Sequence, residues 1–164
     1  MNSAQTALQL ESLLYNRATG WNRELPKHLD SSRTLVLAFG SSNLPPDDAA
    51  FSDLRAAFPQ SVIAGCSTSG EINGARLSDE SVSVGVYRFR EGTLRSAQAP
   101  VRGREDSFRA GALLAEQLNG PELRAVLVYS DGLNVNGTDD LPPRLVPKSM
   151  SLIGCRADGA EPCA

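Results

Sequence analysis

An internal repeat constrains the fold of this chain more than any other feature. The pattern Leu37-x-Phe39-x-Ser41 resembles Leu127-x-Tyr129-x-Asp131, at an offset of 90 residues. Gly65-Cys66-x-x-x-Gly70 resembles Gly154-Cys155-x-x-x-Gly159 at an offset of 89, and each glycine–cysteine pair follows a short apolar stretch. Two matched features in the same order predict a duplicated unit of strand, helix, strand and glycine turn.

Hydrophobic patterning places the elements of the fold. Continuous apolar runs bounded by turn residues indicate buried strands, alternation indicates a half-buried antiparallel strand, and a three-to-four residue period indicates a helix. These rules predict strands at Leu35–Phe39, Val62–Ala64, Ser81–Phe89, Thr93–Ala99 and Ala125–Tyr129, and helices at Ala49–Phe58 and from Asp106 or Ser107 to about Leu118.

The N-terminal segment has a helical spacing of apolar residues. Ala4, Ala7, Leu8, Leu14 and Tyr15 lie three, four or seven residues apart, which predicts a helix from about Ser3 to Ala18 that ends at Gly20. The proline and polar residues that follow predict a connection up to Ser32. We therefore expect residues 1–32 to form a helix and connection, and residues 33–164 to form the main domain.

The second copy of the repeat is irregular. It carries Pro142, Pro143 and Pro147 where the first copy has its predicted helix, and proline is unfavourable inside a helix. The sequence also stops shortly after Gly159. The predicted fold is therefore mixed α/β, with duplicated strand–helix–strand units around a mixed sheet, and we expect an incomplete second copy and an incomplete domain.

Composition excludes several classes of function. The net charge is −3 and the 16 basic residues are scattered, which does not fit a nucleic-acid-binding surface. No apolar run reaches the roughly 18 residues of a membrane span, and the N-terminus does not resemble a signal peptide. Three irregularly spaced cysteines favour a reducing cytoplasm over a disulfide framework. A single histidine, His28, excludes sites that need two imidazoles.

The first candidate site is the run Cys66, Ser67, Thr68, Ser69, Gly70 and Glu71. It follows a predicted strand, and ligands usually bind at the carboxyl ends of strands in α/β sheets. Small residues there let backbone N–H groups converge on an anion or a ligand carboxylate, while Glu71 suits a ligand amine. A tight packing turn is the alternative for the loop, and a solvated or capping carboxylate is the alternative for Glu71.

The second candidate site follows the last predicted strand. Asp131, Asn134 and Asn136 supply polar groups there, and Asn136-Gly137 is a strong turn signal. A structured polar loop without a ligand is the alternative. If both candidate loops border one cleft, they would provide a few convergent polar groups for a small-molecule ligand.

Two single residues suggest other chemistry. Cys66 would serve as a nucleophile if its pKa were lowered and a histidine base lay nearby; a buried structural thiol is the alternative. His28 would serve as a single axial haem ligand; a surface histidine near Pro26 is the alternative. The pattern C-x-x-C-H of covalent haem attachment does not occur.

Three stretches resemble the N-terminal domain of the FIST (F-box and intracellular signal transduction) family. They are Leu35–Gly40, the block Gly65–Ile72 and the block Tyr129–Thr138, so the resemblance covers roughly Arg33 to Thr138. The tail from Leu152 to Gly159 is similar to a degraded form of the family's later glycine-rich block, with Cys155 and Arg156 at positions that are normally small.

The resemblance implies a bacterial sensory module rather than an enzyme. It implies a small-molecule ligand, with amino acids as the expected class, and output through a histidine kinase or a cyclic-dinucleotide signalling protein. One branch of the family resembles haem-based nitric oxide sensors, which is the first alternative function. The second alternative is a truncated fragment without a function of its own.

Overall fold

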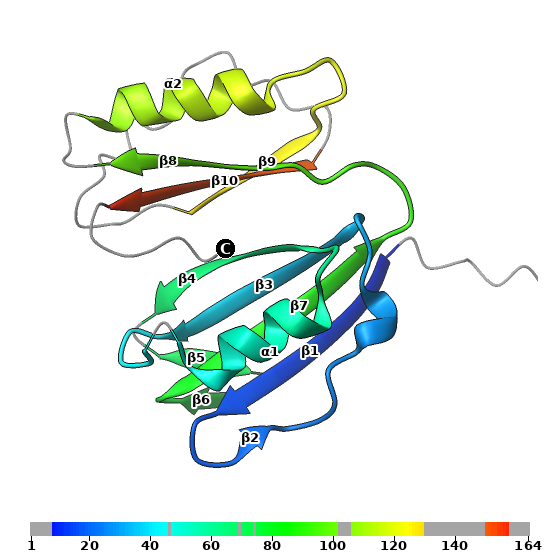
Figure 1. Cartoon of the computed structure of the whole chain (residues 1–164), viewed down its shortest axis with the longest axis vertical. Coiled ribbons are helices and arrows are strands. Elements are labelled where there is room, and N and C mark those ends of the chain that lie inside the picture. The colour runs from blue at the N-terminus through cyan, green and yellow to red at the C-terminus, as the bar shows by residue number, and fades with distance from the viewer. Residues whose placement is uncertain are drawn as a thin grey trace, which may run out of the picture. The chain divides into compact units, whose positions relative to one another are not determined.

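The computed structural model describes residues 8–45, 47–68, 70–73, 75–101, 106–129 and 150–157. The chain divides into two compact units, Met1–Gly92 and Thr93–Ala164. Among the described residues each unit has one α-helix; the first unit has a five-stranded and a two-stranded sheet, and the second has a three-stranded sheet (Figure 1). The chain has the mixed α/β structure that the sequence predicts. The five strands of its largest sheet run in mixed orientation.

The first unit contains the five-stranded sheet, in the order β2-β1-β7-β3-β4. Strand β7 is antiparallel to both of its neighbours, β1 and β3, whereas β3 and β4 are parallel. The strands are β1 (Leu8–Asn16), β2 (Gly20–Trp21), β3 (Thr34–Ser41), β4 (Val62–Thr68) and β7 (Ser81–Phe89).

The predicted N-terminal helix is wrong where the structure describes it, because residues 8–16 form strand β1. This strand pairs with β7 along nine positions, from Leu8 opposite Phe89 to Asn16 opposite Ser81. Alternation then buries Leu13 and Tyr15 against the core. Pairing with a strand some 70 residues away overrides the local helical spacing. The predicted connection also contains β2 and a 3₁₀ turn, η1 (Lys27–Leu29).

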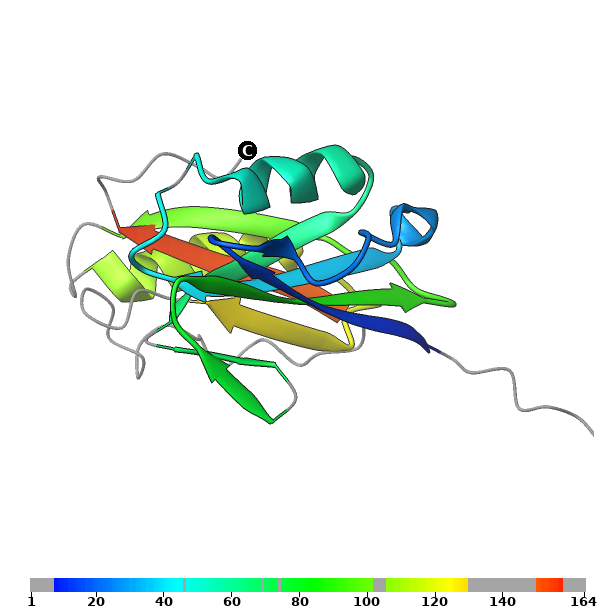
Figure 2. The ribbon, with the colours of Figure 1, turned by 90° about the horizontal axis from the view of Figure 1, so that it is seen from below.

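Helix α1 (Ala49–Ala57) confirms the predicted helix to within one residue. It begins at Asp48, whose carboxylate accepts a hydrogen bond from the Ala50 amide at 3.1 Å, and it ends just before Pro59. Figure 2 shows α1 covering one face of the sheet. Its buried residues pack there against side chains of β1, β3 and β7, including Leu13, Val36 and Val84, to form the core of this unit.

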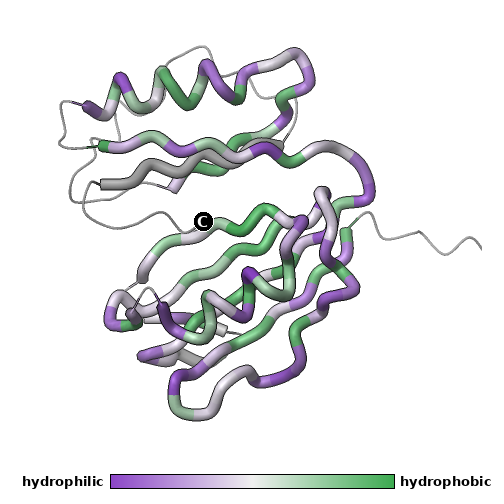
Figure 3. Tube along the Cα trace, in the orientation of Figure 1, coloured by the Kyte–Doolittle hydropathy of each residue, from purple (hydrophilic) through white to green (hydrophobic). Residues whose placement is uncertain are grey.

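Strand β4 differs from its prediction in length and burial. It runs from Val62 to Thr68 and forms an edge of the sheet, so that Ile63 is 37% exposed. The neighbouring β3, which is hydrophobic along most of its length (Figure 3), supplies seven consecutive pairing positions. Gly65 makes this pairing close, because a Cβ atom there would lie 1.7 Å from the Ala38 carbonyl oxygen. Backbone pairing with β3 thus extends β4 as far as Thr68, through residues that the sequence predicts to form a loop.

The second unit has a three-stranded parallel sheet in the order β8-β10-β9. Helix α2 (Ser107–Leu118) covers it with an apolar face that includes Leu114 and Leu118. The strands are β8 (Ser96–Val101), β9 (Ala125–Tyr129) and β10 (Met150–Ala157). The predicted helix, and strands at nearly the predicted places, are confirmed. Strand β9 is an edge strand, with Leu127 37% exposed, rather than fully buried.

Both halves of the sequence repeat contain a parallel strand pair, β3 with β4 and β9 with β10. The two pairs belong to different sheets, and their registers differ by one residue. Phe39 lies opposite Cys66, whereas the matching Tyr129 lies opposite Gly154 instead of Cys155. The proline-rich segment of the second copy lies outside the described residues, so duplication of the whole unit stays a prediction.

Candidate functional site

The first candidate site lies at the carboxyl end of the parallel pair β3–β4. These strands end at Ser41 and Thr68, which lie opposite one another in the register. The chain then forms a two-stranded hairpin of β5 (Glu71–Asn73) and β6 (Arg76–Ser78). Strand β5 contacts β1, β3 and β7, so the hairpin is held against this end of the sheet (Figure 1).

Glu71 is the buried acidic residue of this site. Its side chain is buried, with 1% of its surface exposed. The Thr68 hydroxyl donates to Glu71 Oε1 at 2.7 Å, and the Ser81 hydroxyl donates to Glu71 Oε2 at 2.9 Å. A buried carboxylate requires such donors, because an unsatisfied one is costly. The alternative of a solvated Glu71 carboxylate is therefore wrong.

Glu71 thereby joins three elements, because its partners lie at the end of β4 and at the start of β7. A second contact of this kind supports the hairpin, since the Ser83 hydroxyl donates to the Ile72 carbonyl at 3.1 Å. The Ile72 side chain is 69% exposed. The hairpin is thus fixed by polar contacts on its inner side and presents an apolar side chain to solvent.

The other residues of this candidate site lie along the edge strand. Cys66, Ser67 and Thr68 belong to β4 rather than to a loop after it, and Cys66 and Ser67 are exposed. Gly70 follows with a φ of 147° and leads the chain into β5. Ser69 lies outside the described residues. The predicted loop is therefore wrong for Cys66, Ser67 and Thr68, which belong to β4, and for Glu71, which begins β5.

Cys66 is poorly suited to nucleophilic chemistry. Partial burial raises the pKa of its thiol, although the residue as a whole is exposed. A cysteine nucleophile needs the opposite shift, toward the thiolate. His28 lies in η1, ahead of β3, while Cys66 lies near the far end of β4. The geometry gives the enzyme alternative no support.

The second candidate site cannot be placed beside the first. Asp131, Asn134 and Asn136 lie outside the described residues. They follow β9, which belongs to the second unit, whereas Glu71 belongs to the first. The shared cleft expected for the two loops stays a prediction.

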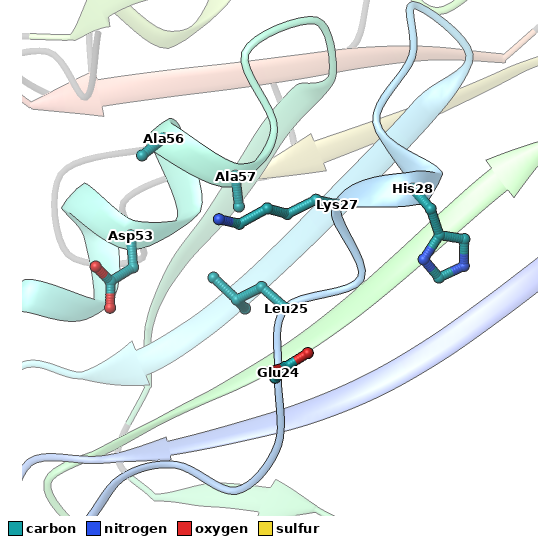
Figure 4. A pocket seen from close by; sticks show the side chains of 7 residues that line it. All are labelled: Glu24, Leu25, Lys27, His28, Asp53, Ala56 and Ala57. Carbon is teal, nitrogen blue, oxygen red and sulfur yellow. The ribbon is translucent and has the colours of Figure 1, made fainter.

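An open pocket of about 590 Å³ lies elsewhere in the first unit, between the segment before η1 and helix α1 (Figure 4). Trp21 fixes one of its carboxylates by donating its indole N–H to Asp53 at 2.9 Å. Figure 4 shows Lys27 extending toward α1, whereas the His28 ring points away from that helix. The lining residues are Glu24, Leu25, Lys27, His28, Asp53, Ala56 and Ala57.

This pocket does not fit haem. A porphyrin needs an apolar slot beside its axial histidine, and here two carboxylates and a lysine are among the seven lining residues. The His28 side chain is exposed at the margin. The described residues also contain no group of three or more His, Cys, Asp or Glu side chains arranged to hold a metal ion.

Comparison with known families agrees with the three stretches quoted above. The sequence matches the FIST N domain over residues 34–160, which is most of the chain. The chain belongs to the FIST family. The FIST N domain is a sensory domain of signal transduction. No curated protein and no solved structure matches the chain significantly. None of the described helices is long and apolar enough to cross a membrane.

Sequence reasoning missed Ser81, whose hydroxyl is the second donor to Glu71. Its residue type carries a weak signal, because a serine at the start of an alternating strand usually faces solvent. The sequence does not point to Glu71 either, because Ser81 alternates with Val82, Val84 and Val86, and Asp79 and Glu80 lie nearer to it along the chain. The burial of Ser81 and its contact with Glu71 arise from the fold, in which strand β5 lies against β7.

Proposed function

We propose that this FIST domain binds a small molecule at the end of β4 and β5, and that amino acids are its ligands. The observation that carries the proposal is the Thr68–Glu71–Ser81 group. It places a buried carboxylate and two hydroxyls at the carboxyl end of a parallel strand pair, where α/β sheets commonly bind ligands.

The proposed contacts of the ligand are of two kinds. Thr68 is partly exposed and Ser67 and Cys66 are exposed, so these three offer direct contacts from β4. Glu71 and Ser81 are buried and act behind them, by orienting Thr68. Ser69, Gly70, Asp131, Asn134 and Asn136 complete the proposed set. The structure of Ser69 and of the last three is not described.

The proposed output is protein–protein signalling. We propose that ligand binding changes how the domain engages a histidine kinase or a cyclic-dinucleotide signalling protein, as the family resemblance implies. The fixed β5–β6 hairpin, with Ile72 69% exposed, is a rigid feature next to the ligand site through which such a change would pass.

A thermal-shift screen of the full chain against the twenty amino acids tests the proposal. A ligand at 100 times its Kd should stabilise the native state by about 2.7 kcal/mol. Thr68→Val should abolish the shift, Thr68→Ser should retain it, and Thr19→Val, at an exposed turn outside the site, should leave it unchanged. The proposal fails if no amino acid raises the melting temperature, or if Thr68→Val and Thr19→Val behave alike.

A further inference from the structure

We infer that the Thr68–Glu71 pair recognises the ammonium group of the ligand, so that the site selects amines over the corresponding carboxylic acids. This inference rests on the proposed function, because it names the chemical class that the same site accepts. Three features of the site support it: the direction of the hydroxyl protons, the charge of Glu71 and the partial exposure of Thr68.

The proton of Thr68 is held by the protein. A hydroxyl has one proton to donate and two lone pairs that accept. The Thr68 hydroxyl lies 2.7 Å from Glu71 Oε1 and 3.4 Å from the Gly40 carbonyl oxygen, and both of these groups accept only. Whichever of the two takes the proton, the hydroxyl presents lone pairs, and not its proton, to a ligand.

Glu71 accepts one hydrogen bond at each oxygen of its carboxylate, and the Thr68 hydroxyl supplies the shorter of the two, at 2.7 Å. Ser81, which is fully buried, uses its own proton on the second oxygen of the same carboxylate. Glu71 therefore accepts hydrogen bonds from two hydroxyls. The bond from Thr68 makes the Thr68 oxygen a better acceptor for a hydrogen bond from a ligand.

The negative charge of Glu71 has no counter-ion among the described side chains. The ion pairs found there involve Asp48, Glu11, Asp106 and Glu122, and none of them involves Glu71. A buried carboxylate without a neighbouring cation favours a positively charged ligand, because the electric field of the carboxylate is poorly screened. Thr68 is only partly buried, whereas Glu71 and Ser81 are fully buried, so Thr68 is the member of this group through which a ligand would interact with the charge.

The inference separates the two ends of an amino acid. Its ammonium group donates three hydrogen bonds and carries positive charge, so it matches the Thr68 oxygen backed by Glu71. A carboxylate in the same place would face lone pairs and a buried negative charge. Any carboxylate contact must therefore come from other groups, and loss of the amine should cost more affinity than loss of the carboxylate.

The test is a thermal-shift and calorimetric comparison of matched probes on the full chain. Each amino acid is tested beside its decarboxylated amine and its deaminated acid, for example alanine with ethylamine and propionate, and arginine with agmatine. We expect the amines to retain stabilisation and the acids to lose it. Stabilisation by the acids but not by the amines would overturn the inference and leave the proposed binding function in place.

Failure of the proposed function gives a different result. If no amino acid stabilises the chain but the amines do, the ammonium preference stands and amino acids are not the ligands. If neither amino acids nor amines stabilise the chain, both the inference and the proposed ligand class are wrong.

Glu71→Gln tests the mechanism directly. A carboxamide can donate to one of the two hydroxyls, which frees that hydroxyl to turn its proton outward, and it removes the charge. Affinity for the amine probes should fall by about tenfold or more, the value of one hydrogen bond to a charged group. Glu91→Gln removes the same charge from an exposed turn and should leave affinity unchanged. An equal loss in both variants would show a net-charge effect and overturn the inference.

Discussion

At the scale of single residues, Gly65 determines how closely β4 pairs with β3. A Cβ atom at this position would lie 1.7 Å from the Ala38 carbonyl oxygen and 2.7 Å from its carbon, both of which are backbone atoms that cannot rotate away. Gly65→Ala should therefore lower the free energy of unfolding by about 3 kcal/mol or more, through overpacking. Urea denaturation followed by circular dichroism measures this.

Gly120→Ala is the matched control for this substitution. Nothing lies within 4 Å of a Cβ atom at Gly120, and its backbone is not in the left-handed region. The same added methyl group should therefore change stability by less than about 0.5 kcal/mol. If the two variants were equally stable, the close approach of β4 to β3 would be wrong.

Cys66 gives a pH-dependent prediction at the same scale. Burial of its thiol raises the pKa above the ordinary value, so the thiolate fraction at neutral pH is smaller than in an unstructured peptide. Iodoacetamide should modify Cys66 more slowly than a cysteine peptide at pH 7.5, and the rate should increase on moving to alkaline pH. Mass spectrometry of the Cys66 peptide measures the rate. Modification faster than in the reference peptide would contradict the raised pKa and support a catalytic role for the thiol.

At the scale of elements, Asp48 connects helix α1 to strand β1. Its carboxylate caps the helix at the Ala50 amide and also bonds the Tyr15 hydroxyl, and it is only 8% exposed. Asp48→Ala should lower the free energy of unfolding by about 1–2 kcal/mol, since it removes a helix cap and a partner of a buried hydroxyl. Chemical denaturation measures the loss.

Asp47→Ala provides the comparison for that variant, because Asp47 is adjacent, exposed and carries the same charge. Its effect on the free energy of unfolding should be small.

Burial first, and Asp48 second, raise the pKa of Tyr15. This tyrosine therefore contributes stability below its unfolded pKa, and that contribution is lost as the pH rises through the folded value. Asp48→Ala should lower the Tyr15 pKa in an ultraviolet titration, and an unchanged titration would contradict the contact.

The elements also show what the sequence can predict. Both helices and the alternating strand β7 were predictable because their apolar periods are set by neighbouring residues. Strand β1 was not, since its partner β7 lies far along the chain and the spacing of Leu8, Leu14 and Tyr15 also fits a helix. The burial of Glu71 was hidden for a similar reason, because Ser81, its second donor, lies ten residues away on another strand.

At the scale of the whole molecule, the folded unit extends beyond the matched region. The match to the FIST N domain begins at residue 34, yet Leu13, Tyr15 and Leu29 belong to the core of the first unit. Strand β1 also separates β2 from β7 within the sheet. A segment that supplies an inner strand and core side chains is part of the cooperative unit and cannot be a detachable extension.

This arrangement predicts different outcomes for two leucines of the same strand. Leu13 is fully buried, so Leu13→Ala should lower the free energy of unfolding by about 2–5 kcal/mol. Leu10 is 55% exposed, so Leu10→Ala should change it by no more than about 0.5 kcal/mol. Denaturation of the full chain measures both. Were residues 1–32 a separate helix and connection, neither leucine would affect the unfolding of the domain. A large loss for Leu13→Ala alone therefore decides between the two descriptions of this segment.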